Sequence, residues 1–90
     1  MITVHLPPDL AEEFSAAPVL ELSAGSLAEM VDALDARHAG IRHWLTEADG
    51  RFREHLSVFV GGVRWTDVSD WRGRLADGDV VWVLRAVSGG

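Results

Sequence analysis

Ninety residues, 48% of them hydrophobic, suffice for one small globular domain with a single core and exclude a second domain. The formal net charge of −6 argues against a nucleic-acid partner, because phosphate recognition needs clustered positive charge, and it favours a basic protein partner. The chain has no cysteine, so we expect no disulfide and no side-chain thiol or persulfide chemistry.

Two strands are predicted at the start of the chain. Apolar residues alternate with polar ones over residues 2–6, which is typical of a half-buried strand, and Pro7 and Pro8 end it because proline donates no ladder hydrogen bond. A second short strand is predicted over residues 18–22.

One main helix follows these strands. Ser26 and Glu29 have the spacing of an N-terminal capping box, and the residues after Ser26 are apolar at helical intervals. We expect this helix to run to about His38 and to end at Gly40, with one further apolar turn after it.

The second half of the chain reads as strands separated by glycine turns. Strands are predicted over residues 56–60, 63–65 and 80–84, the first two joined by Gly61 and Gly62, with irregular structure between the last two. This order predicts an α+β domain over residues 1–84, in which a mixed sheet packs on the main helix and the first and last strands are parallel neighbours. Residues 85–90 are predicted to form a flexible tail that ends in a diglycine.

Residues 59–62, 75–81 and 83–90 together resemble the ubiquitin-like sulfur-carrier family. This family includes the small subunit of molybdopterin synthase, the thiamine sulfur carrier, and relatives that serve cysteine or thio-natural-product synthesis. The resemblance implies a β-grasp fold. The chain departs from the family at Gly61-Gly62, where Asn-Gly is usual, and at Arg85, where proline is usual.

The resemblance also implies a function centred on the last residue. An E1-like adenylating enzyme would use ATP to activate the carboxylate of Gly90, which would become a thiocarboxylate and donate its sulfur on an accepting synthase. Gly89 and Ser88 would let the tail pass into a foreign active site, and Val87 either anchors the tail or packs as an ordinary apolar residue. The carrier itself would bind no cofactor and would not be an enzyme on its own.

A recognition surface is predicted from strand parity. If Val81 and Val83 face the helix, Phe59, Trp82 and Leu84 project from the opposite face of the sheet. Exposed clusters of this kind mark interfaces, so we expect these three residues and Arg85 to contact the partner enzymes. The alternative is that residues 65–71 cover Trp82 and Phe59.

Other functions have less support. The four histidines show no metal-ligand motif, and no charged leader or long apolar run indicates export or membrane insertion, so the cytoplasm is expected. Two alternatives to a sulfur carrier stay open: a ubiquitin-like modifier joined through Gly90 to lysines of other proteins, and an interaction domain with an inert tail. The sequence leaves the pathway that receives the sulfur open.

Overall fold

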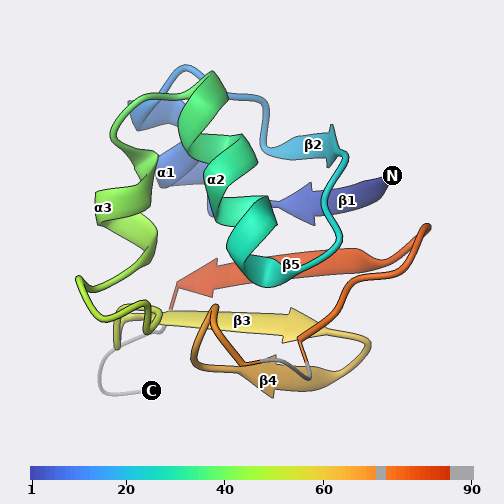
Figure 1. Ribbon diagram of the computed structural model, residues 1–90. Coiled ribbons are helices and arrows are strands. Elements are labelled where there is room, and N and C mark those ends of the chain that lie inside the picture. The colour runs from blue at the N-terminus through green and yellow to red at the C-terminus, as the bar shows by residue number, and fades with distance from the viewer. Residues whose placement is uncertain (71–72, 86–90) are drawn as a thin grey trace.

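A five-stranded mixed sheet with helices on one face forms the protein (Figure 1). The computed structural model describes residues 1–70 and 73–85. The elements follow in the order β1 (Ile2–His5), α1 (Pro8–Glu13), β2 (Val19–Leu22), α2 (Leu27–Arg37), α3 (Ile41–Leu45), β3 (Leu56–Val60), β4 (Val63–Trp65) and β5 (Val80–Arg85). The strand order in the sheet is β2-β1-β5-β3-β4, which makes the last strand the middle one. This is the predicted α+β, β-grasp architecture.

The first and last strands are parallel neighbours, as predicted. Val4 of β1 lies opposite Val81 of β5, whereas β3 runs antiparallel to β5 on its other side. A strand that is paired along both edges cannot fray easily, because its backbone donors and acceptors are used within the sheet. The chain segment that leads to the diglycine therefore follows a strand that is paired along both edges.

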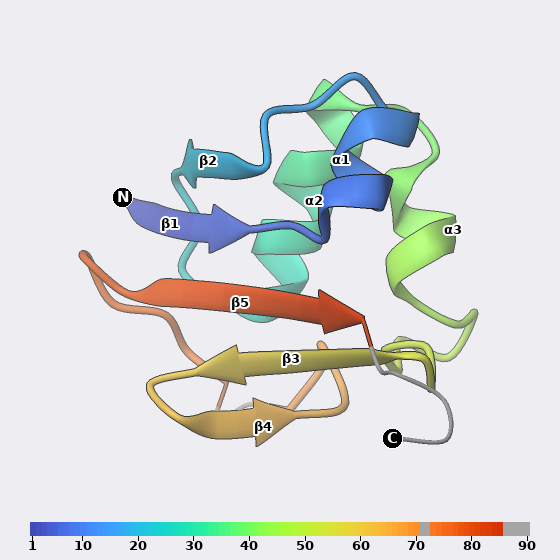
Figure 2. The same cartoon turned by 180° about the vertical axis from the view of Figure 1, so that it is seen from behind.

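The core lies between the sheet and the helices. On β5, Val81 and Val83 are buried whereas Val80, Trp82 and Leu84 are exposed, so the strand alternates as a sheet covered on one face does. The buried valines pack in one cluster with apolar residues of α2, among them Met30 and Leu34. Seen from behind, the sheet faces the viewer and α2 lies beyond it (Figure 2). Among the described residues, no helix covers the face of the sheet that points away from α2.

The main helix begins as the capping box predicts. The Ser26 side chain accepts a hydrogen bond from the Glu29 backbone N–H at 3.1 Å, and its hydroxyl lies 3.3 Å from the Glu29 carboxylate. At the other end, α2 stops at Arg37, and Gly40 has a φ of 97°, a left-handed conformation that favours glycine. The Asp35 carboxylate accepts hydrogen bonds from the backbone N–H groups of Gly40 and Arg42, which fixes the start of α3.

Gly61 and Gly62 close the β3–β4 hairpin. Their φ values are 58° and 82°, so both central residues of the turn are left-handed. Such two-residue turns match the twist of the flanking strands and favour glycine or asparagine at these positions. Replacing the family's usual Asn-Gly by Gly-Gly therefore preserves the turn.

Helix α1 was not predicted. The two prolines were interpreted only as the end of the first strand, but Pro7 is the N-cap of this helix and Pro8 is its first residue, where a missing N–H costs nothing. Leu10 and Ala11 of α1 are buried in the core. The first strand also ends at His5, one residue earlier than predicted, and β5 continues through Arg85, one residue into the predicted tail.

Candidate functional site

The predicted site residues divide into a described and an undescribed group. Phe59, Trp82 and Leu84 lie on the open face of the sheet, and Arg85 is the last residue of β5. Val87, Ser88, Gly89 and Gly90 fall outside the described residues, so their roles stay predictions.

The open face carries a row of large side chains across four strands. Trp82 of β5 lies opposite Phe59 on one side and His5 on the other, and His5 in turn lies opposite Val19 of β2. Together with Leu84, two residues further along β5, these residues form what we call the sheet-face patch. Trp82 is 46% exposed and Leu84 44%, so the predicted shared face is confirmed and the patch is accessible.

The His5 imidazole and the Trp82 indole are stacked. Their ring centroids are 3.6 Å apart and the ring planes differ by 11°. The hollow beside this stack has a volume of about 340 Å³ and is bordered by Pro18, Val19 and Leu84. Its walls are mostly apolar, which suits a protein partner better than a charged small molecule.

Trp65 does not cover the patch. It lies opposite Val58 in the β3–β4 register, which places it on the helix side of the sheet, and it packs against the core. Trp71, the other residue considered as a cover, is outside the described residues.

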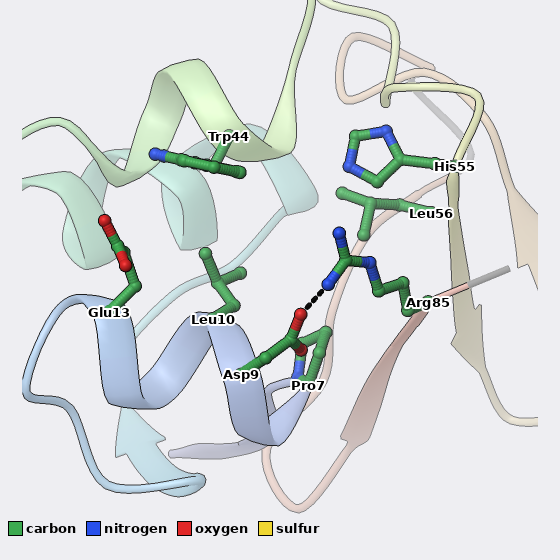
Figure 3. A pocket seen from close by; sticks show the side chains of 8 residues that line it. All are labelled: Pro7, Asp9, Leu10, Glu13, Trp44, His55, Leu56 and Arg85. Carbon is green, nitrogen blue, oxygen red and sulfur yellow. Dashed lines mark ion pairs between the residues drawn. The ribbon is translucent and has the colours of Figure 1, made fainter.

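A second hollow lies where the tail begins (Figure 3). It has a volume of about 170 Å³, and α1, α3, the start of β3 and the end of β5 contribute to it. Arg85 forms an ion pair with Asp9 on one side of this hollow, and Trp44 lies over Leu10 on the other. Sequence reasoning missed this site because Asp9, Leu10 and Glu13 belong to the unpredicted α1.

The described residues contain neither a metal-binding cluster nor a membrane-spanning helix. Within residues 1–70 and 73–85, no group of three or more histidine and acidic side chains is placed to hold a metal ion. Among the helices of the described chain, none is long and apolar enough to cross a membrane.

Three solved structures share this fold over their whole length. One chain of the Amycolatopsis orientalis BexX/CysO complex is 25% identical to this protein, with a TM-score of 0.84 and complete coverage of both chains. The Mycobacterium tuberculosis antigen CysO is 26% identical, with a TM-score of 0.78 over 97% of this chain and 100% of its own. SAMP1 from Haloferax volcanii is 23% identical, with a TM-score of 0.74 over 99% and 98% of the two chains.

The likeness is confined to these structural comparisons. No protein-family model matches the sequence, and no curated protein matches it significantly.

Proposed function

Since the chain belongs to the ubiquitin-like sulfur-carrier family, we propose that it carries sulfur as a thiocarboxylate on Gly90. Its structural neighbours are small carrier proteins and not enzymes, and this protein is a carrier of the same kind. The coarse function is that of a sulfur carrier or modifier. The thiocarboxylate chemistry and the partners named below are the proposal.

The position of β5 in the middle of the sheet, directly before the last five residues, is the observation that carries this proposal. The middle strand β5 ends at Arg85, and five residues then lead to the terminal carboxylate. Five extended residues span at most roughly 17 Å, enough to cross the mouth of an enzyme and reach a nucleotide inside. Two glycines at the end have no Cβ to obstruct a narrow channel.

The chemistry would take place in two enzymes that the tail enters in turn. In the first, the Gly90 carboxylate attacks the α-phosphate of ATP, which releases pyrophosphate and leaves an acyl adenylate. A sulfide then displaces AMP and gives the thiocarboxylate; with a persulfide donor, the acyl disulfide formed first is reduced by a thiol. In the second enzyme, the thiocarboxylate sulfur attacks an activated precursor of molybdopterin, cysteine, thiamine or a thio-natural product.

The carrier's own contribution would be recognition and delivery. Binding of the tail places the two reacting groups next to each other in one active site, and this proximity supplies much of the rate. We propose that the E1-like adenylating enzyme and the accepting synthase both bind the sheet-face patch and Arg85. One structural neighbour was crystallised in a protein complex, BexX/CysO, which supports binding to enzymes.

Protein modification is the second candidate. The solved SAMP1 structure from Methanosarcina acetivorans is that of a small archaeal modifier protein, and it is 20% identical to this chain. A modifier shares the adenylation step but forms an amide between Gly90 and a lysine of another protein. This chain has no lysine, so it could not be joined to a side-chain amine of its own kind.

Intact mass spectrometry of the protein from its native cell separates these functions. A carrier should show a free species heavier by one oxygen-to-sulfur exchange, and alkylation should trap it at Gly90. A modifier should instead appear as a Gly-Gly remnant on lysines of other proteins after trypsin digestion. If the protein from cells grown with ample sulfur carried only an unmodified carboxylate, and no remnant were found on other proteins, the tail would be inert.

A further inference from the structure

The hollow at the start of the tail has two halves, and each contains a carboxylate of α1. In one half, the Arg85 guanidinium pairs with the Asp9 carboxylate beside apolar surface. In the other half, Glu13 supplies a carboxylate and Trp44 an aromatic ring, and Leu10 also lines this half (Figure 3). We call the second half the Glu13–Trp44 half.

The helix α1 places both carboxylates on the same side. Asp9 and Glu13 are four residues apart, so their side chains lie one above the other on one face of the helix. Asp9 is paired with Arg85, whereas Glu13 has no hydrogen-bond or ion-pair partner in the described part of the chain. Trp44 is 46% exposed. Tryptophan side chains are mostly buried on average, so an exposed one is a candidate for contact with another protein.

We propose that the Glu13–Trp44 half receives an arginine side chain of the enzyme that adenylates Gly90. A guanidinium can stack on the Trp44 ring while it donates hydrogen bonds to the Glu13 carboxylate. The Arg85–Asp9 pair shows that the same hollow already accommodates one guanidinium against a carboxylate of α1. The hollow has a volume of about 170 Å³ in all, and Glu13 and Trp44 line it together with Arg85 and Asp9.

The position and the charge of the hollow identify its occupant as part of the adenylating enzyme. Only five residues separate Arg85 from Gly90, so an enzyme that encloses the tail must touch the rim of this hollow. The net charge of −6 favours a basic enzyme surface, and Glu13 supplies one negative charge at the hollow that Arg85, already paired with Asp9, does not offset. This inference rests on the proposed function and adds a second contact, which adjoins the hollow of the sheet-face patch at Asp9 and Arg85.

The hollow can be tested first without any enzyme. Indole NMR signals of Trp44 and Trp82 are followed while N-acetyl-arginine N-methylamide is added, with the uncharged citrulline analogue as control. The arginine probe should shift Trp44 in a saturable way and leave Trp82 in place. Glu13→Gln should weaken this binding by roughly two- to fivefold, as expected for one exposed ion pair, and Glu12→Gln on the same helix should leave it unchanged.

Two results of the titration would overturn the inference. Equal Trp44 shifts with the arginine and citrulline probes would show that the charge is not recognised. If the Val87→Ser substitution alone shifted the Trp44 signal from its wild-type position without any ligand, the chain's own tail would fill the hollow.

Steady-state kinetics with the E1-like enzyme of the same organism give the second test. Glu13→Arg should raise the KM for the carrier tenfold or more without lowering kcat, because the contact serves binding and not the adenylation step. Glu12→Arg carries the same change in charge and should raise KM much less. Equal KM values for the two variants would overturn the inference alone, whereas no adenylation of the wild-type chain would overturn the proposed function and the inference with it.

Discussion

The His5 imidazole stacks on the Trp82 indole across the parallel β1–β5 pair, with ring centroids 3.6 Å apart. Phe59 lies opposite Trp82 on the antiparallel side. Trp82 is thus flanked by an aromatic residue on each neighbouring strand, although it remains 46% exposed. A large side chain that is held in place before a partner arrives loses less conformational entropy on binding. This arrangement holds Trp82 in place within the sheet-face patch.

The stack should contribute to stability through a measurable coupling. In a double-mutant cycle of His5→Ala and Trp82→Ala, the coupling free energy of unfolding should be about 0.5–1.5 kcal/mol, the range for aromatic pairs. Chemical denaturation of the four proteins measures it. Effects that add within about 0.3 kcal/mol would show that the rings do not interact in solution.

Trp82 should matter more for binding than for folding. Trp82→Ala should weaken binding to the adenylating or the accepting enzyme by roughly 2 kcal/mol or more, about thirtyfold, if Trp82 is a hot spot of the interface. The free energy of unfolding should change much less. Leu34→Ala, which truncates a fully buried residue, should show the opposite behaviour and lose about 2–5 kcal/mol of stability. Calorimetric titration and denaturation of both variants measure the contrast, and unchanged affinity in Trp82→Ala would remove the patch from the binding site.

The fold was predictable where short-range patterns determine it. The alternation of Val81 and Val83 with Trp82 assigned the two faces of the last strand, and the element order placed that strand beside the first. Helix α1 was not predicted because its six residues are too few to show a helical period. Its stability comes from burial of Leu10 and Ala11 in the core.

The candidate site was predictable only in part. The alternation of side chains along the strands predicts that Phe59, Trp82 and Leu84 share one face. The stack of Trp82 with His5, however, depends on the register of two strands that lie far apart in the sequence. The hollow beside Arg85 combines α1 with elements from the middle and the end of the chain. Such long-range contacts leave no local pattern in the sequence.

Ser26 should stabilise the main helix through its cap. Ser26→Ala removes the acceptor for the Glu29 backbone N–H and should lower the free energy of unfolding by about 1 kcal/mol. Ser23→Ala is the matched control, because Ser23 is exposed and precedes the helix. Equal stability of the two variants would show that the hydrogen bond contributes nothing.

Asp67 should make a small, pH-dependent contribution to stability. The Ser69 hydroxyl and backbone N–H both donate to its carboxylate, and these hydrogen bonds lower the pKa of Asp67 below its ordinary value of 3.8. A lowered pKa in the folded state means that the contribution is present above the ordinary pKa and is lost as the pH falls through the lowered one. The stability difference between the wild type and Asp67→Asn should therefore shrink on acidification. Ser69→Ala should reduce this pH dependence, and a difference that stays constant with pH would contradict the assignment.

The last prediction concerns Gly90, the residue to which the proposed chemistry assigns the reactive group. Deleting Gly90, or adding one glycine after it, moves the carboxylate by one residue relative to the nucleotide of the adenylating enzyme. Either change should abolish ATP-dependent thiocarboxylate formation, because adenylation requires the carboxylate within bonding distance of the α-phosphate. The melting temperature should not change, since Gly90 lies five residues beyond the end of β5 at Arg85 and has no side chain to bury. Mass spectrometry after incubation with the enzyme, ATP and sulfide measures the product, and undiminished sulfur transfer by the shortened chain would refute the carrier mechanism.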